Sequence, residues 1–484
     1  MLRKKVLLIG EKPSQIKKFR ETLFSNFQTS KEGKMIYSYH GTWSGNHAVY
    51  EVTMLPLSGH ISTLDTPEEY GWGKVNPVTI VEDPKAIQTI FNSGYYKIIT
   101  RMARNTDELW IATDPDSEGD NIGWEAYTIA CKANKNLQRN VRRIWNASLT
   151  TSEILRSIKI AEIGSLGWDL NLAFSVQGRR LVDAWLGFAG TRELTRSASH
   201  VQKIDVLSVG RVQIPTLKII VDRDNEHEQF IPQNLWNLLL LVRKQEESVE
   251  NNSFIAKHEK SPFSNEQDLD IILNSIKEEN FAIIKEINKK KTNKSPPVPL
   301  NTTAALSLIA GIYHVKVEDA LRIMSDLYLE GLISYPRTEN NYFKPDFPHD
   351  KILHELKKDN VFLPFIRRIN NFNQVRTNGK KKGVEDHDPI FPTGELPEDK
   401  NQKITPLHRK VWETLTRYYI SLFLSDLIIF RTKIKLIVRN ENFIAMGSEI
   451  IDKGWTDLTP WVQTDTNFLP PLNENEIVEI INHR

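Results

Sequence analysis

The chain has 484 residues, with 63 Lys and Arg against 61 Asp and Glu, and a single cysteine, Cys131. This length predicts three or four folded units, at about 100–200 residues per domain. One thiol excludes an internal disulfide and a cysteine-based zinc ribbon. No apolar run approaches the roughly 20 residues that cross a bilayer, so we expect no membrane span. The net charge of +2 favours no class of partner.

Two apolar runs of strand length end in charged turns. Val6–Ile9 precedes Glu11 and Lys12, where a secretory signal would have a small-residue cleavage site, so the run reads as the first strand of a cytoplasmic protein. The run 109–113 precedes an acidic turn and a helical pattern over 121–130. Strand, charged turn and helix are typical of an α/β domain whose site lies at the carboxyl ends of parallel strands.

The middle and the end of the chain alternate between helical and strand patterns. Apolar residues recur at near-helical intervals from Thr150 to Ser199, which predicts a mostly helical segment. Residues 235–254 and 427–450 are rich in β-branched and aromatic residues and predict two antiparallel regions that could pair into one sheet.

An insertion separates these two β-rich regions. The Lys-rich and Pro-rich stretch 285–299 predicts a hinge or linker, with a solvated surface loop as the alternative. A helical period over 317–328 ends at Gly331, a good helix stop, and leads directly into Tyr335. Residues 370–383 read as a flexible loop.

The acidic turn is the most informative segment for chemistry. Asp114, Asp116, Glu118 and Asp120 stand within seven residues at the end of a strand. Four carboxylates so close repel one another unless a divalent cation or protons neutralise them, which predicts a site for a hard metal ion. The alternative is that the acids cap the following helix and favour its N-terminal dipole.

A second candidate is Tyr335, followed at the second position by Arg337. A lone tyrosine at a strand end is usually a packing residue. On a strand, however, the guanidinium would point to the same face and could hold a phosphate against the phenol oxygen. A phenol, with an ordinary pKa near 10, needs a nearby cation or proton acceptor to attack a phosphodiester at neutral pH.

Other candidates carry weaker signals. Arg179 and Asp183 lie on a predicted helix, where a structural salt bridge is as plausible as a phosphate contact. The run 208–213 has a glycine that could let the backbone approach a polyanion, and His387 could bind a phosphate or be structural. The sequence contains no P-loop, so a P-loop ATPase is not supported.

Taken in order, these segments resemble the type IA DNA topoisomerases, most closely the topoisomerase III branch. The resemblance runs from Leu7 to about Ile480 and is carried by five motifs: Glu11-Lys12-Pro13-Ser14, Ala112-Thr113-Asp114-Pro115-Asp116-Ser117-Glu118-Gly119, Leu207-Ser208-Val209-Gly210-Arg211-Val212-Gln213, Leu329 to Glu339 around Tyr335, and His387-Asp388-Pro389-Ile390-Phe391-Pro392-Thr393. The acidic motif alone would indicate only a Toprim domain, which primases and some nucleases share.

The resemblance implies a multidomain α/β protein with a toroidal architecture. Its parts would be a Rossmann-like Toprim domain over 1–150, an incomplete helical domain over 151–215, a β-rich arch over 216–284 and 400–484, and an inserted domain over 285–399 that carries the catalytic tyrosine.

The resemblance also implies roles for individual residues. Tyr335 would be the nucleophile that keeps the 5′-phosphate of a cleaved strand, with Arg337 stabilising charge on that phosphate. Lys12 would help protonate the departing 3′-oxygen, and Glu11 would act in the same acid/base network. The metal ligands for Mg²⁺ would be Asp114, Asp116 and Glu118. Residues that would contact the strand or support the site are Arg142, Arg179, Asp183, Arg211, Gln213, Thr338 and His387.

The implied activity is ATP-independent cleavage of single-stranded or underwound DNA, passage of a strand and rejoining. This activity would relax negative supercoils or decatenate DNA. The implied location is cytoplasmic and nucleoid-associated. The chain stops near Ile480, where family members continue into further helices, and Ser117 stands where an arginine is common. We therefore expect either a second polypeptide that supplies the missing helices, as from a split gene, or a truncated product. The alternatives are a Toprim-type Mg-dependent nuclease or primase and an inactive DNA-binding subunit.

Overall fold

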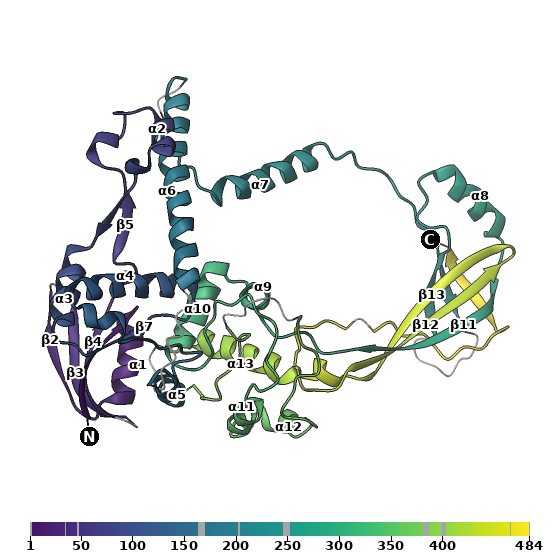
Figure 1. Cartoon of the computed structure of the whole chain (residues 1–484). Coiled ribbons are helices and arrows are strands. Elements are labelled where there is room, and N and C mark those ends of the chain that lie inside the picture. The colour runs from purple at the N-terminus through teal and green to yellow at the C-terminus, as the bar shows by residue number, and fades with distance from the viewer. Residues whose placement is uncertain are drawn as a thin grey trace. The chain divides into compact units, whose positions relative to one another are not determined.

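The structure, a computed structural model, describes residues 2–33, 35–45, 48–162, 170–201, 204–244, 252–380, 387–397, 403–464 and 466–483 (Figure 1). The chain forms two compact units. Unit 1 comprises 1–227, 300–344 and 380–413, and unit 2 comprises 228–299, 345–379 and 414–484. Among the described residues, no helix is long and apolar enough to span a membrane.

Unit 1 is built on a six-stranded mixed sheet. Its strands, in spatial order, are β2 (Phe27–Lys31), β3 (Tyr37–Ser44), β4 (Ala48–Pro56), β1 (Leu2–Gly10), β7 (Glu108–Ala112) and β8 (Val141–Arg143). β1 lies between β4 and β7 and runs parallel to both, so that Gly10 pairs with Ala112. The segments that follow β1 and β7 therefore leave the sheet at the same edge.

Helices cover this sheet. α3 (Ser93–Ala103) and α4 (Ser117–Ala133) share one buried core with alternate residues of the central strands, among them Leu7, Ile9 and Ile111. α1 (Pro13–Leu23) and α5 (Thr151–Glu162) pack against each other beside the sheet (Figure 1). This arrangement confirms the α/β domain expected at the start of the chain.

Further helices complete unit 1. A two-stranded sheet, β5 (Ser62–Asp65) and β6 (Gln88–Phe91), and α2 (Pro77–Glu82) lie along α6 (Leu170–Ser199), and α7 (Gln213–Glu228) follows. α5 and α6 confirm the helical segment expected after residue 150. The tyrosine-bearing part contains α9 (Thr302–Tyr313) and α10 (Val317–Leu329), and α13 (Pro406–Ser421) begins in this unit.

Unit 2 is organised around a closed barrel. The strands follow one another in the order β10 (Ser253–His258), β13 (Glu441–Asp452), β12 (Leu427–Val438), β11 (Phe281–Lys294), β14 (Ile477–His483) and β9 (Leu239–Arg243). The two β-rich regions of the sequence therefore pair into one sheet, as expected. α8 (Glu266–Ile276) packs on the barrel core, and the short helices α11 (His349–Leu356) and α12 (Leu363–Ile366) also belong to this unit.

The linker expected over 285–299 is wrong for its first ten residues. Residues 285–294 continue β11 and pair with β12 from Lys294 back to Ile283. Lysines exposed on both faces of a strand lack the apolar alternation that identifies one, which explains the error. The expected domain boundaries at 215 and 285 fall inside α7 and β11. Residues 370–380 contain no helix or strand, and 381–383 of the expected loop lie outside the described residues.

Candidate active site

The carboxyl ends of β1 and β7 bring Glu11, Lys12 and Asp114 together. The Lys12 ammonium lies 2.6 Å from Asp114 Oδ2 and 3.1 Å from Glu11 Oε1. Glu11 Oε2 accepts a hydrogen bond from the Asp114 backbone N–H at 3.1 Å. Both carboxylates are buried. Two buried acids share one cation, as expected for turns that face each other across adjacent parallel strands.

Charge in this group keeps Lys12 protonated. Burial lowers the pKa of Lys12, but the charges on Asp114 and Glu11 outweigh burial and the pKa is raised overall. Burial and the neighbouring Glu11 charge raise the pKa of Asp114, although Lys12 opposes them. Lys12 is therefore an ammonium at neutral pH, able to donate a proton to an oxygen that develops negative charge.

The turn after β7 is held in a tight shape. Asp116 caps α4 by accepting the Gly119 backbone N–H at 2.6 Å, so the capping alternative is confirmed for this one acid. A Cβ on Gly119 would lie 2.0 Å from the Asp114 carbonyl oxygen. No other residue type fits at Gly119 without displacing the backbone that carries the acids.

Arg143 fastens the same turn from β8. Its guanidinium donates to Asp120 Oδ1 at 2.7 Å and to the carbonyl oxygens of Thr113 and Asp114 at 2.8 and 2.6 Å. The side chains of Arg143 and Asp120 are fully buried. Arg142, which the family resemblance pointed to, lies elsewhere, 2.9 Å from Glu108. Adjacent residues of a strand point to opposite faces of the sheet. Arg143 therefore reaches the turn, and Arg142, the arginine that was expected there, does not.

The tyrosine segment enters the site from α10. Gly331, at φ +78°, ends the helix in the left-handed conformation that favours glycine. The Tyr335 backbone N–H then donates to the Ala147 carbonyl oxygen at 3.0 Å, which ties the segment to the Toprim part. The Tyr335 hydroxyl donates to Asp116 Oδ2, 219 positions away in sequence. The structure thus brings together the phenol and the acids that the sequence singled out separately.

The Tyr335 phenol is protonated in this arrangement. Burial, followed by the negative charges of Asp114 and Asp116, raises the pKa of Tyr335 far above its usual value. Only 6% of the residue is exposed. The phenol can act as a nucleophile only if its proton has an acceptor, and Asp116 is already placed to be that acceptor.

Aromatic rings surround Tyr335. The His387 ring lies 5.4 Å from it, centroid to centroid, and burial lowers the pKa of His387 to about 4, against the opposing charge of Asp116. Trp145 stacks on His387 at 5.4 Å, and the Arg143 guanidinium lies over Trp145. Tyr328 packs edge-on against Tyr335 at 5.2 Å. His387 was expected here, whereas Trp145 and Tyr328 carried no sequence signal beyond their aromatic character.

The expectation that Tyr335 and Arg337 share one face of a strand is wrong. Residues 334–338 form no regular strand, and Tyr335 is buried while Arg337 is exposed. Thr338 is buried and has a structural position, since its backbone N–H donates to Thr302 Oγ1 at 2.7 Å.

Arg179 of α6 and His60, which follows β4, reach the acidic turn from other elements. Arg179 forms an ion pair with Glu118, and His60 Nε2 lies 3.0 Å from the same carboxylate. His60 had no signal in the sequence, because nothing local indicates that the loop after β4 meets α4.

A second polar group joins α6 to the start of α7. Arg211 Nε donates to Asp183 Oδ1 at 2.8 Å, and Gln213 Nε2 donates to Ser208 Oγ at 3.1 Å. The side chains of Asp183, Arg211 and Gln213 are exposed. Asp183 pairs with Arg211, whereas Arg179, the partner considered for it within the helix, pairs with Glu118.

The three expected metal ligands have the right chemistry for Mg²⁺, which prefers carboxylate oxygens. Their arrangement here does not fit it. In the described part of the chain no three His, Cys, Asp or Glu side chains are grouped so as to hold a metal ion. Asp114 is engaged by Lys12, Asp116 by Tyr335, and Glu118 by basic side chains.

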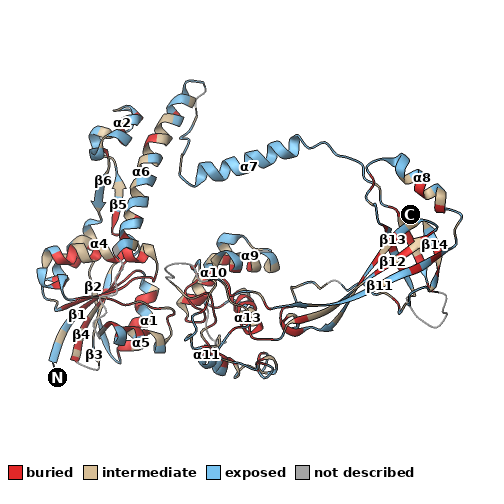
Figure 2. Cartoon of the chain, turned by 45° about the vertical axis from the view of Figure 1, so that its right-hand side comes forward, coloured by how far each residue is buried: buried red, intermediate tan, exposed pale blue. Residues whose placement is uncertain are grey.

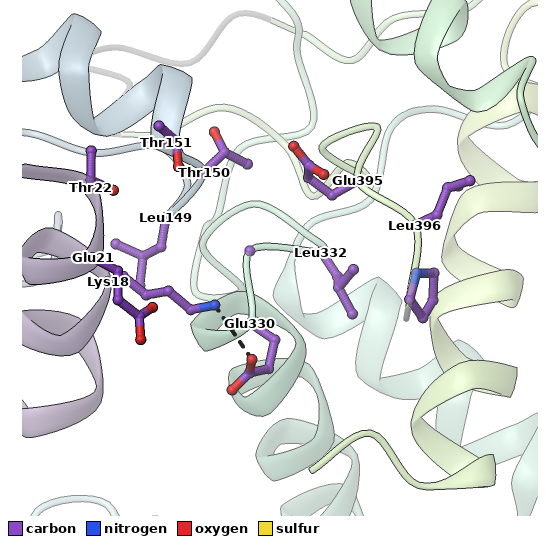
Figure 3. A pocket seen from close by; sticks show the side chains of 12 residues that line it. Lys18, Glu21, Thr22, Leu149, Thr150, Thr151, Glu330, Leu332, Glu395 and Leu396 are labelled. Atoms are coloured by element: carbon purple, nitrogen blue, oxygen red, sulfur yellow. Dashed lines mark hydrogen bonds and ion pairs between the residues drawn. The ribbon is translucent and has the colours of Figure 1, made fainter. Parts of the chain in front are cut away.

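A cavity of about 360 Å³ lies where the tyrosine-bearing part meets the Toprim part (Figure 3). Its walls come from α1, from residues 149–151, from the end of α10 and from residues 395–397. Lys18 of α1 reaches across it to Glu330, at 3.4 Å, and Lys403 lies 3.1 Å from the other oxygen of Glu330. The Lys18–Glu330 ion pair connects the acid-bearing and the tyrosine-bearing parts of unit 1, and Lys403 pairs with Glu330 from the segment before α13.

Comparison with known proteins identifies the family and the fold. The family model described as DNA topoisomerase matches residues 168–484, and the Toprim domain model matches residues 6–149. The DNA topoisomerase 1 of Archaeoglobus fulgidus is 27% identical over 99% of this chain and 67% of its own length. The DNA topoisomerase 3 of Saccharomyces cerevisiae is 27% identical over 98% of this chain and 78% of its own length.

Among solved structures, the full-length topoisomerase I of Thermotoga maritima shares the fold. It matches with a TM-score of 0.67 at 18% identity, over 98% of this chain and 70% of that one. Among eight of the similar curated relatives, the chain spans from 52% to 78% of the relative's own length. Since a family model covers more than half of the sequence, the chain belongs to the type IA DNA topoisomerase family.

Proposed function

We propose that this chain is an ATP-independent topoisomerase that cleaves one strand of single-stranded or underwound DNA, passes a strand through the break and rejoins it. The observation that carries the proposal is the hydrogen bond from the Tyr335 hydroxyl to Asp116. A nuclease or primase that used the same acids would have no need of a phenol delivered into them. A DNA-binding scaffold would need neither the phenol nor the acids.

The cleavage step follows from the groups at the site. Tyr335 Oη forms a bond to phosphorus and the bond from phosphorus to the 3′-oxygen breaks, which leaves a 5′-phosphotyrosine and a 3′-hydroxyl. The phenol proton leaves through Asp116 to solvent. Lys12 protonates the 3′-oxygen and regains a proton from solvent, with Glu11 holding the ammonium in place. Arg337 would neutralise charge on the phosphate.

Rejoining is the reverse of the same step. The tyrosyl ester conserves the energy of the broken phosphodiester, so the 3′-hydroxyl can attack it without an external energy source. The family resemblance implies Mg²⁺ at Asp114, Asp116 and Glu118; since their arrangement here does not fit the ion, these side chains would have to rearrange to hold it, and when bound it would supply positive charge. In this arrangement protein donors engage all three carboxylates, so Mg²⁺ has to compete with Lys12 and Arg179.

The helical part supports the expectation of a second polypeptide. α7 has 16 residues, and none of them is buried among the described residues, as its uniform exposed colouring shows (Figure 2). Leu217, Ile219 and Ile220 are 53%, 70% and 54% exposed. A helix of this length is marginal alone in water and normally needs a packed apolar face. We propose that helices of a second polypeptide cover α7.

The function is tested by incubating the chain with negatively supercoiled plasmid and Mg²⁺, with and without ATP. We expect ATP-independent relaxation that is lost in Tyr335→Phe and on chelation of the metal. Nicked plasmid that persists in Tyr335→Phe would support the nuclease instead, and DNA binding without any cleavage would support the inactive subunit. Full relaxation by this chain alone, at rates equal to those of longer relatives, would contradict the need for a second polypeptide.

A further inference from the structure

Tyr328 is a second tyrosine beside the proposed nucleophile. It lies on α10, seven residues before Tyr335, and is only 3% exposed. The two rings meet edge to face, with centroids 5.2 Å apart and planes at 76°. Aromatic pairs of this geometry are favourable beyond the area they bury. Together with His387 on another side, Tyr328 therefore holds the ring of Tyr335 in one orientation.

The hydroxyl of Tyr328 is unusual for a buried group. It has no hydrogen-bond partner among the residues the structure describes. The buried Tyr419 of unit 2 shows the ordinary case, since its hydroxyl lies 2.8 Å from His349 Nδ1. An unsatisfied buried donor destabilises the fold, and phenylalanine would fill the same space without that cost. Packing alone therefore does not account for a hydroxyl at this position.

The charges that act on the Tyr328 hydroxyl indicate which groups it could donate a hydrogen bond to. Three acids act on it through their charges, Glu11, Asp114 and Asp116, and we call them the acid cluster. Burial, followed by the charges of these three acids, raises the pKa of Tyr328 well above its usual value, against the opposing charge of Arg143. The hydroxyl therefore keeps its proton, and its ring packs against Tyr335, which itself donates to Asp116 of the acid cluster.

The proposed cleavage step creates a need for such a donor. Before cleavage, the Tyr335 hydroxyl donates to Asp116. Once Tyr335 Oη is bonded to phosphorus it carries no proton, so Asp116 loses this donor. The partly buried Asp116 then keeps the Gly119 backbone N–H but lacks a side-chain donor, and hydrogen bonds to ionised carboxylates are the stronger ones.

We propose that Tyr328 is a positioning residue for strand cleavage: its ring orients Tyr335, and its hydroxyl becomes the donor to the acid cluster in the covalent state. This inference rests on the proposed function. It predicts that the hydroxyl donates no hydrogen bond to the acid cluster before cleavage and stabilises the covalent intermediate by donating one.

The experiment uses the whole chain and a single-stranded oligonucleotide labelled at its 3′ end. The fraction of label that migrates with denatured protein reports the equilibrium between intact and covalently bound DNA. We expect Tyr328→Phe to lower this fraction about tenfold or more, as loss of a hydrogen bond to a charged group does, with an unchanged or higher thermal midpoint. Tyr328→Leu, which also removes the ring, should in addition slow adduct formation.

Tyr419→Phe is the matched control. It removes a satisfied buried hydroxyl from unit 2, so it should lower the thermal midpoint and leave the adduct fraction unchanged. An adduct fraction in Tyr328→Phe within twofold of the wild type would overturn the inference while leaving the proposed function intact. Absence of an adduct in the wild type, or its persistence in Tyr335→Phe, would overturn the proposed function and this inference with it.

Discussion

Replacing Arg143 with methionine should loosen the acidic turn more than any other single change of a charged residue near it. The Arg143 side chain is fully buried, pairs with the equally buried Asp120, and donates to two carbonyl oxygens of the turn. Methionine has a similar length but no charge and no donor. Removing one partner of a buried ion pair typically costs about 3–5 kcal/mol, because the other charge stays buried without compensation.

Hydrogen exchange measures this loss locally, which suits a chain with two units. A loss of about 3–5 kcal/mol corresponds to a fall of about two to three and a half orders of magnitude in the protection of backbone amides in β7 and α4. Arg142→Met is the matched control on the neighbouring position. Its partner Glu108 keeps Lys4 and the Trp110 indole N–H, so protection should fall by about tenfold or less.

The double variant Arg143→Met with Asp120→Leu sharpens the test. If the cost in Arg143→Met comes from the stranded carboxylate, removing that carboxylate too should restore part of the protection. Two results would refute this reasoning. One is an equal loss of amide protection in Arg143→Met and Arg142→Met. The other is a double variant whose loss of protection equals the sum of the losses in its two single variants.

Three further predictions concern other parts of the chain. Burial lowers the pKa of His349 to about 4, so between pH 6.5 and pH 4 the unfolded chain binds a proton that the folded chain does not. The free energy that protects the amides of α11 from exchange should therefore be greatest above pH 6.5 and fall by about 3 kcal/mol toward pH 4. This pH dependence should vanish in His349→Gln. Gly119→Ala should abolish covalent adduct formation, because its Cβ would collide with the Asp114 carbonyl oxygen, while circular dichroism shows the barrel retained. Glu330→Gln removes the charge that pairs with Lys18, so hydrogen exchange should speed up at residues 332–335, and unchanged exchange would contradict a role for this ion pair.

Features that depend on local pattern could be predicted from the sequence. Two apolar runs followed by charged turns correctly indicated β1 and β7, and parallel pairing then required Glu11 and Asp114 to meet. The helical period before Gly331 correctly indicated α10, because the glycine occupies a left-handed position that stops a helix. The two separate β-rich regions do share one barrel.

Features that depend on contacts between distant parts of the chain could not be predicted from the sequence. Sequence does not say which of Arg142 and Arg143 faces the turn, since this depends on the register of β8 in the sheet. It does not reveal that His60 meets Glu118 or that Tyr328 lies beside Tyr335, because these contacts are made by loops and helices whose placement is set by the whole of unit 1.

The central claim is that Tyr335 and the acids of the Toprim part form one reaction centre. The most direct measurement is to trap the protein on single-stranded DNA, digest protein and DNA, and locate the attached nucleotide by mass spectrometry. We expect a 5′-linked nucleotide phosphate on Tyr335 in the wild type, and a marked loss of this product in Lys12→Ala. A nucleotide on any other residue, or cleavage with no covalent attachment at all, would contradict it.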